Sequence, residues 1–187
     1  KHSEVSLSNV TIGSSAFLQC GITELTLENC DLNGTKIFDN NTIEKLTLSE
    51  TDIPDEMFYC DSYIKTLVAE DSVLGSMSFV GCTELENVSV SGGEIKSDAF
   101  LECPSLETVT IDNIDSVGGF AFNNCQALKT VEVNATEISE YAFSMCTSLK
   151  NVKLGDNVEI IGDAVFEGCA SLAELELPET VTEIGKV

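Results

Sequence analysis

The sequence has no arginine and no tryptophan, and it contains one histidine, His2, and only three prolines. Its basic side chains are nine lysines, which stand against 32 acidic residues and leave a formal net charge of −23. Nucleic acids and anionic membrane surfaces are bound through clustered positive charge, so this balance argues against both as partners. It favours basic partners or divalent cations, although an elongated protein with a large surface also needs charge to stay soluble.

Long apolar runs and catalytic side chains are also scarce. No stretch approaches the roughly 20 apolar residues of a spanning helix, so we expect no membrane insertion within this chain. Carboxylates are plentiful, but on an open surface they lack the cleft and the oriented base that a catalytic site requires. There is no Cys-x-x-Cys pair and the one histidine is near the N-terminus, which argues against a metal site. We therefore expect no enzymatic activity, no cofactor and no bound metal.

What the chain does contain is a phenylalanine every 20 to 23 residues. These residues are Phe17, Phe38, Phe58, Phe79, Phe100, Phe122, Phe143 and Phe166. A fixed period in this range is typical of a solenoid, in which each repeat is one supersecondary unit that packs on its neighbours. Solenoids offer elongated surfaces that usually bind other macromolecules.

Each repeat carries the same phrase, of which Phe100, Cys103, Leu106, Val109 and Ile111 are a clear copy. The last two positions have the alternation of a strand, and the apolar residues from the preceding isoleucine to the cysteine have a spacing that suits a short helical turn. We therefore predict an α/β fold with parallel strands about 4.8 Å apart on one face and short helical or irregular returns. Columns of stacked Phe, Leu and strand aliphatics should form the core.

The copies between Gly21 and Glu70 depart from this phrase. Asn41 stands where the second copy should have its cysteine, and Cys60 comes one position early in the third copy. We expect irregular turns in this part of the chain.

The phrase as a whole resembles a known repeat family. Residues 161–178 read Ile-Gly-Asp-Ala-Val-Phe-Glu-Gly-Cys-Ala-Ser-Leu-Ala-Glu-Leu-Glu-Leu-Pro. This motif resembles the BspA-type leucine-rich repeat of surface proteins from host-associated anaerobic bacteria, treponemes and some protozoa, and the resemblance covers nearly the whole chain. It implies a right-handed leucine-rich-repeat solenoid, an extracellular or cell-surface location, and often adhesion to host matrix proteins or other cells. It brings no catalytic residues.

Both ends of the chain interrupt the repeat pattern. Residues 4–8 have the pattern of a strand from an earlier repeat, and Ile184-Gly185 opens a further repeat that does not reach its phenylalanine. We predict that residues 1–187 are a single solenoid domain and a fragment of a longer protein.

The eight cysteines follow the repeat with one exception. They are Cys20, Cys30, Cys60, Cys82, Cys103, Cys125, Cys146 and Cys169, and only Cys30 lies outside the phrase. Repeat cysteines share one structural position, so the spacing favours a column of buried free thiols that donate weakly to backbone carbonyls. Disulfides are the alternative in an exported protein, most plausibly between Cys30 and Cys20 or Cys60.

The strand residues that alternate outward predict an exposed sheet face. We take as candidate ligand-binding residues Thr26, Thr47, Ser89, Thr108, Thr110, Thr130, Glu132 and Lys153. Such a face offers hydrogen bonds to an extended protein or glycan, whereas threonine also suits exposed strand positions without any ligand. The two outward columns that contain these residues have no aromatic side chain, which weakens a glycan-stacking role.

Two acidic clusters are candidate cation sites. Asp52, Asp55 and Glu56 form one cluster, and Asp112 and Asp115 form the other. Neither has the glycine-spaced loop with a closing glutamate of an EF-hand. Solvated charged faces are the simpler interpretation.

Two functions remain open from the sequence. The first is a cell-surface module that binds a protein or glycan ligand on host or neighbouring cells through the sheet face. The second is a structural spacer that projects another domain from the cell surface. Lysines placed at Thr110 and Thr130 would separate them, because only the first function depends on that face.

Overall fold

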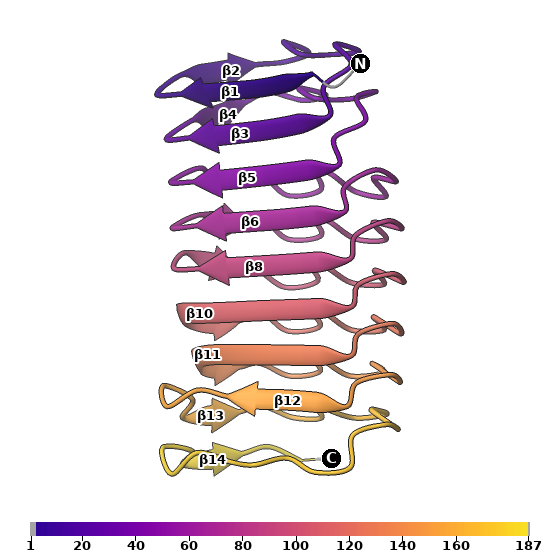
Figure 1. The fold of residues 1–187 in the computed structure, drawn as a ribbon. Helices are drawn as coiled ribbons and strands as arrows, with labels where there is room; N and C mark the ends of the chain where they lie inside the picture. The colour runs from indigo at the N-terminus through magenta and orange to yellow at the C-terminus, as the bar shows by residue number, and fades with distance from the viewer. Residues whose placement is uncertain (1–2, 187) are drawn as a thin grey trace.

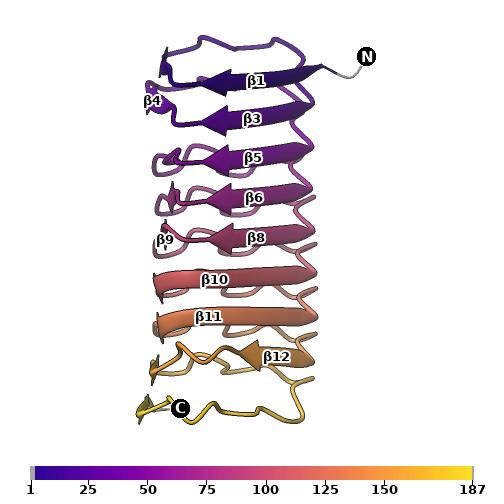
Figure 2. The same cartoon turned by 60° about the vertical axis from the view of Figure 1, so that its left-hand side comes forward.

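The structure is a computed structural model that describes residues 3–186, and it shows one elongated stack of coils (Figures 1 and 2). The strands are Glu4–Ser8 (β1), Thr11–Gly13 (β2), Glu24–Glu28 (β3), Asp31–Asn33 (β4), Lys45–Ser49 (β5), Thr66–Glu70 (β6), Val73–Leu74 (β7), Asn87–Ser91 (β8), Glu94–Ile95 (β9), Thr108–Val117 (β10), Thr130–Ile138 (β11), Asn151–Leu154 (β12), Ile160–Ile161 (β13) and Glu183–Ile184 (β14). All strand pairs are parallel.

The long strands form one continuous face, in the order β1-β3-β5-β6-β8-β10-β11, with β12 paired to β11. Alternation decides which side chains are inside: in β8, Val88 and Val90 are buried while Asn87, Ser89 and Ser91 are exposed. The same pattern in each coil places the aliphatic columns in the core. The predicted parallel sheet is therefore confirmed.

The short strands form a second ladder around the corner from the long ones. It runs from β7 through β9 to β13 and β14, and it passes through the far ends of β10 and β11, whose pairing shifts register between Asp112 and Ile114 at the corner. Strands β2 and β4 pair only with each other and form a separate two-stranded sheet.

The remaining side of each coil is a tight return. We number these returns 1 to 8 and define each as the segment from three residues before to three residues after its phenylalanine, from 14–20 (return 1) to 163–169 (return 8). Each return contains two residues with positive φ, four positions apart. They are Ser15 and Gln19, Lys36 and Asn40, Glu56 and Cys60, Met77 and Gly81, Asp98 and Glu102, Phe120 and Asn124, Tyr141 and Met145, and Ala164 and Gly168.

This conformation overturns the expected helical returns and the α/β class, because residues 3–186 contain no helix. A left-handed residue at every fourth position interrupts the run of right-handed dihedrals that successive α-helical hydrogen bonds require. Instead, Ala99 N donates to Lys96 O within the return, and Phe100 N donates across to Ala121 O of the next return at 2.8 Å. Paired turns, and not a helix, bury the regularly spaced apolar residues. Of the two predicted kinds of return, only the irregular one is confirmed.

The phenylalanines form the expected column. Neighbouring rings from Phe17 to Phe166 stack nearly parallel, with centroids 4.9 to 6.4 Å apart. The four central rings, Phe79, Phe100, Phe122 and Phe143, are fully buried. Aromatic stacking of this kind adds about 0.5–1.5 kcal/mol per pair beyond the buried area.

The cysteine column is confirmed for five residues. The thiols of Cys82, Cys103, Cys125, Cys146 and Cys169 are buried and free, and each donates to the carbonyl of the phenylalanine one coil earlier at 3.1–3.3 Å. Burial raises the pKa of the Cys146 thiol to about 12 and also raises that of Cys169. These two thiols therefore stay protonated and remain able to donate.

The same column departs from expectation near the N-terminus. Cys20 and Cys60 are exposed, and all eight cysteines are free thiols. The position three residues after Phe58 holds Asp61, whose carboxylate accepts the N–H groups of Tyr63 and Ile64 at 2.8 and 3.0 Å. Because Cys60 comes one position early, the turn directs it outward and the aspartate takes its place.

Cys30 belongs to a column of side-chain hydrogen bonds at the corner that follows the long strands, and we call this column the corner ladder. The Cys30 N–H donates to Thr51 Oγ1 and the Thr51 N–H donates to Ser72 Oγ, both at 3.0 Å. Each of these three side chains also donates to the carbonyl two residues before it. This position explains why Cys30 is buried, and no disulfide is needed to account for it.

One junction in the stack is incomplete, and we call it the seam. Six of the seven junctions between neighbouring returns contain three N–H···O=C hydrogen bonds, such as Phe17 to Ile37 and Phe58 to Ser78. Within residues 3–186, no such bond joins return 2 (35–41) to return 3 (55–61). Strand β4 likewise has no partner in the third coil, and the Phe38–Phe58 ring distance, 6.4 Å, is the longest in the column.

Three sequence features account for the seam. Pro54 has no N–H, whereas Gly75, one coil later, donates its N–H to Ile53 O at 2.9 Å. Asp61, when ionised, cannot donate to Phe38 O as a cysteine would. The segment before return 2 is also longer by one residue. Three residues separate Leu32 from Lys36, whereas two residues separate Ile53 from Glu56 before return 3.

The C-terminal end also differs from the expectation. Leu175 and Leu177 occupy the two strand positions of the repeat phrase, but residues 172–182 form no strand and Leu177 is 47% exposed. Because this segment leaves the sheet, the free edge of β12 is open (Figure 2).

Candidate ligand-binding face

The candidate residues lie in two straight columns across the front sheet. In the first column, Thr26 is in register with Thr47, then Val68, Ser89, Thr110, Glu132 and Lys153. In the second, Glu24 is followed by Lys45, Thr66, Asn87, Thr108, Thr130 and Asn151. The periodic alternation of the strands creates this arrangement, because every coil presents the same two outward positions.

Most of these side chains are exposed. Thr47 and Thr130 are half-buried, and the other six candidates are exposed. Neighbouring polar groups contact each other across strands, as in the 2.6 Å hydrogen bond from Thr108 Oγ1 to Asn87 Oδ1. Six strand spacings of about 4.8 Å separate Thr26 from Lys153, so the candidates form a surface roughly 30 Å long and not one compact site.

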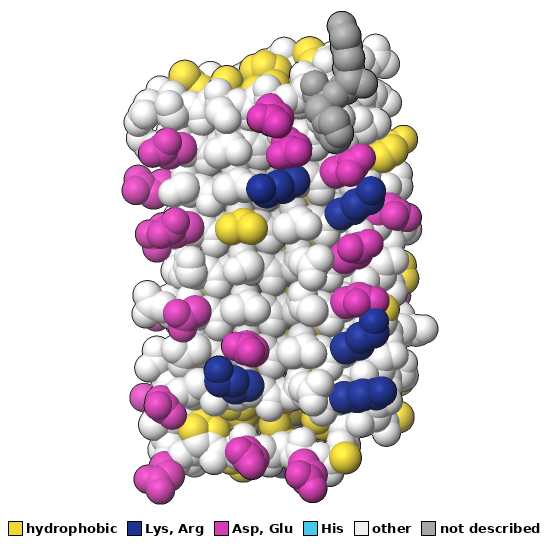
Figure 3. Space-filling model, in the orientation of Figure 1, with side chains coloured by type: hydrophobic (Ala, Val, Ile, Leu, Met, Phe, Trp, Pro, Cys, Tyr) yellow, Lys and Arg dark blue, Asp and Glu magenta, His cyan; other side chains and the backbone are white. Residues whose placement is uncertain are grey.

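The sheet face holds more than half of the scarce positive charge. Lys45 and Lys153 lie in long strands, and Lys65, Lys129 and Lys150 directly precede long strands, which places five of the nine lysines here. Figure 3 shows lysine side chains among acidic side chains on this face.

Three of these lysines form ion pairs with a carboxylate of the preceding coil. Lys65 pairs with Glu44 at 3.3 Å, Lys153 pairs with Glu132 at 3.5 Å, and Lys129 pairs with Glu107. All three pairs are exposed, so each contributes little to stability, about 0–1 kcal/mol. Their charges remain accessible to a ligand.

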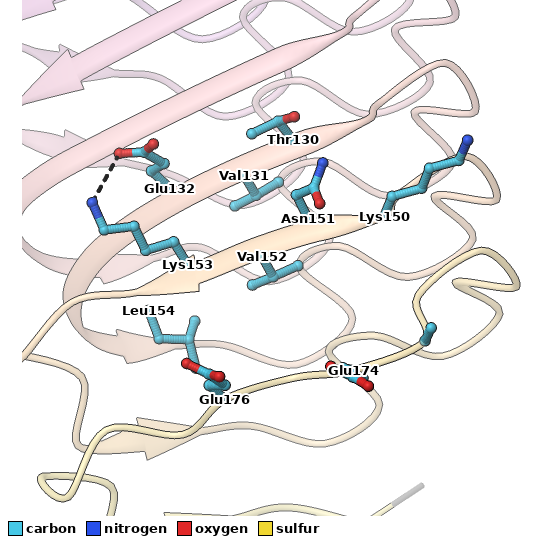
Figure 4. Close-up of a pocket in the computed structure, with 11 residues that line it drawn as sticks. Thr130, Val131, Glu132, Lys150, Asn151, Val152, Lys153, Leu154, Glu174 and Glu176 are labelled. Carbon is cyan, nitrogen blue, oxygen red and sulfur yellow. Dashed lines mark ion pairs between the residues drawn. The ribbon is translucent and has the colours of Figure 1, made fainter.

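A hollow of about 490 Å³ lies at the C-terminal end of the face. It opens between β12 and residues 173–176, where the last segment leaves the sheet (Figure 4). Its lining residues are Thr130, Val131, Glu132, Lys150, Asn151, Val152, Lys153, Leu154, Ala173, Glu174 and Glu176. Charged groups of both signs therefore surround an apolar floor formed by Val131, Val152 and Leu154.

The structure thus brings three of the eight candidates, Thr130, Glu132 and Lys153, to one hollow. Thr26, Thr47, Ser89, Thr108 and Thr110 lie along the sheet away from it. Lys150 is a lining residue that the sequence reasoning missed. The signal was present, because the position directly before each long strand is charged from Glu44 to Lys150.

Three of the five residues in the acidic clusters accept hydrogen bonds within the fold. Asp52 Oδ1 accepts the N–H of Val73, and Asp55 Oδ1 accepts the N–H of Ser76, both at 2.8 Å. Asp112 accepts a hydrogen bond from Asn134 Nδ2 at 2.7 Å. Within the described residues, no group of three or more His, Cys, Asp or Glu side chains has the geometry of a metal site. The part of the chain that the structure describes also contains no helix that could cross a membrane.

Comparison with protein families gives one result that covers the whole chain. The model of the BspA type leucine rich repeat region matches six copies, over residues 1–93 and 93–187. No curated protein matches the chain at a significant level.

The solved structures that are similar to this chain include two bacterial leucine-rich-repeat proteins. A Treponema pallidum leucine rich repeat protein aligns with 21% identity and a TM-score of 0.52, over 88% of this chain and 72% of that one. A leucine rich cell surface protein from Faecalibacterium prausnitzii aligns with 27% identity and a TM-score of 0.52, over 72% of this chain and 38% of that one. The first similarity supports the fold alone.

Proposed function

The chain belongs to the BspA-type leucine-rich-repeat family, and from that membership we propose that it is an extracellular, cell-surface module that binds a protein ligand through its sheet face. Leucine-rich-repeat proteins generally serve protein–protein interaction, and the Faecalibacterium relative is a cell surface protein. Adhesion to host or neighbouring cells is the role that fits a surface protein of this kind.

The observation that carries this proposal is the continuous exposed face with its C-terminal hollow. The hollow combines exposed hydrogen-bonding groups, ion-paired charges and a small apolar floor within one area. Interfaces of protein partners combine an apolar centre with a polar rim in this way. The absence of aromatic side chains from both columns favours a protein ligand over a glycan. We therefore place the centre of the binding surface at Thr130, Glu132 and Lys153.

The experiment is a binding screen of the chain against extracellular matrix proteins and glycans. The Thr110→Lys, Thr130→Lys double variant should lose binding, because two large cations replace small hydroxyl groups on the face. A matched control, Thr83→Lys with Ser97→Lys, makes the same charge change at exposed positions on the return side and should bind as the parent does.

No binding by the parent would instead support the alternative, in which the array is a structural spacer. The uninterrupted ladder of long strands, from β1 to β12, is the observation that favours this alternative. A spacer would tolerate both double variants equally.

A further inference from the structure

The seam lies among the returns, away from the outward columns of the sheet face. Figure 1 shows it near the top of the stack, where the return loops on the right-hand side are more widely spaced than those below. A hollow of about 480 Å³ lies there, and its lining comes only from residues 34–39 and from Pro54 to Met57 with Tyr59. It shares no residue with the hollow of the sheet face.

The two walls of this hollow have complementary unpaired backbone groups. Every other junction pairs the N–H groups at the two positive-φ positions and at the phenylalanine with carbonyls of the next return. At the seam, the corresponding donors are the N–H groups of Lys36, Phe38 and Asn40, for which the structure shows no acceptor within residues 3–186. The acceptors left over are the carbonyls in the facing segment 55–59.

This polarity restricts the ligand. One wall presents only donors from its ladder and the other presents only acceptors, so the ligand must accept hydrogen bonds on one side and donate them on the other. A polypeptide backbone has both kinds of group at regular spacing, and addition of a segment to an open backbone ladder is an established mode of peptide recognition. Small anions or cations would satisfy only one wall.

The side chains around the hollow add a charge preference. Asp39, Asp55 and Glu56 line it together with one lysine, Lys36. Tyr59 is 55% exposed and supplies an aromatic surface beside them. Acidic groups with an aromatic neighbour favour lysine or arginine side chains.

We propose that the seam between returns 2 and 3 binds a basic, extended polypeptide segment of a partner protein, whose backbone completes the interrupted hydrogen-bond ladder. This site is independent of the sheet face. Backbone groups on both walls recognise the ligand, together with the carboxylates of Asp39 and Glu56, which are exposed and accept no hydrogen bond within residues 3–186.

The test uses an acetylated, amidated octapeptide in which Lys and Val alternate. Its binding is followed by fluorescence anisotropy, and amide hydrogen exchange locates it. At saturation we expect exchange at Lys36, Phe38 and Asn40 to slow by at least about tenfold, because these N–H groups acquire acceptors. Unchanged exchange at these three amides in the saturated complex would overturn the proposal.

Two comparisons separate backbone recognition from attraction between opposite charges. The same peptide N-methylated at alternate residues cannot donate to the wall of return 3, and it should bind at least about tenfold more weakly. Equal affinity of the two peptides would refute a completed ladder. The corresponding Glu-Val peptide should not slow exchange at the three amides.

Matched variants complete the design. Asp39→Asn with Glu56→Gln should weaken binding of the Lys-Val peptide roughly fivefold. Glu84→Gln with Glu102→Gln makes the same change in net charge at exposed positions away from the seam and should leave the affinity unchanged. An equal effect of the two pairs would contradict the proposed site. The Thr110→Lys, Thr130→Lys variant should still bind this peptide, so the proposed sites at the sheet face and at the seam are tested independently.

Discussion

A single position in the repeat, three residues after the phenylalanine, shows how side-chain chemistry decides whether two coils are joined. A cysteine there donates to the preceding coil, as Cys103 does to Phe79 O at 3.1 Å. Asn41 performs the same task with its amide, which donates to Phe17 O at 2.7 Å and accepts the N–H of Ile22 at 3.0 Å. Asp61 is the exception, because an ionised carboxylate only accepts.

Asp61 should therefore destabilise the fold at neutral pH. Burial raises its pKa above the usual 3.8, although the N–H groups of Tyr63 and Ile64 partly oppose the shift. A folded-state pKa above the unfolded value means that the folded state binds the proton more tightly, so stability falls as pH rises through that interval. Asp61→Asn keeps an acceptor and gains a donor, and it should stabilise the protein by about 1 kcal/mol at neutral pH.

Urea unfolding followed by circular dichroism from about pH 7.5 to about pH 4 checks this prediction. The advantage of Asp61→Asn should shrink toward the acid end, where the parent carboxyl becomes protonated. An advantage that is independent of pH would show that the ionised carboxylate is not its cause.

Thr51 holds the middle of the corner ladder. Its hydroxyl accepts the N–H of Cys30 at 3.0 Å and donates to Ser49 O at 2.9 Å. Thr51→Val has nearly the same shape but leaves the buried Cys30 N–H without an acceptor, and it should cost about 1–3 kcal/mol of unfolding free energy. Thr51→Ser keeps the hydroxyl and should cost less than Thr51→Val. Equal losses in urea unfolding would mean that packing, and not the hydrogen bond, matters at this position.

At the scale of elements, the seam divides the stack into parts joined by fewer bonds. Across it, the β3–β5 pairing and the corner contacts remain, while the return ladder is missing. In quasi-one-dimensional proteins, stability depends on the interfaces between neighbouring repeats, so a weak interface allows local opening.

Native-state hydrogen exchange measures this opening directly. The Phe17 and Phe100 amides occupy equivalent positions and donate to Ile37 O and Ala121 O at 3.0 and 2.8 Å. We expect Phe17 to exchange at least about 100-fold faster, because it lies on the N-terminal side of the seam. Similar protection of the two amides would show that the stack opens as one unit.

The elements that the sequence predicted are those with a strong period. The strands, the phenylalanine column and the thiols from Cys82 to Cys169 follow from side chains that recur at fixed spacing and must be buried together. The returns could not be predicted in detail, because the same apolar spacing fits a helical turn or paired turns. Left-handed residues as different as Lys36 and Phe120 give no compositional signal for the second choice.

The candidate site was predictable to a similar degree. Alternation in the strands places Thr110 and Thr130 on the outer face, as expected. The hollow was not predictable, because it depends on residues 173–176 leaving the sheet although their sequence continues the strand pattern. The seam was not predictable either, because Pro54 and Asp61 appear in the sequence as ordinary turn residues. It is recognised only from the missing hydrogen bonds between returns 2 and 3.

At the scale of the whole molecule, the charge is unevenly divided. The chain has a net charge of −23, yet five of its nine lysines belong to the sheet face. Only four of the nine lysines lie elsewhere in the sequence. This distribution favours a partner that binds a face with charges of both signs, and it disfavours nonspecific association through the acidic sides.

The most direct test of the account is the affinity of a ligand found in the binding screen for four single variants along the face. Thr26→Lys, Ser89→Lys, Thr110→Lys and Thr130→Lys each place one cation in an outward column, progressively closer to the C-terminal hollow. We predict that affinity falls increasingly from the first to the last, with a loss of at least about tenfold for Thr130→Lys. Unchanged affinity across all four folded variants would contradict binding through the sheet face.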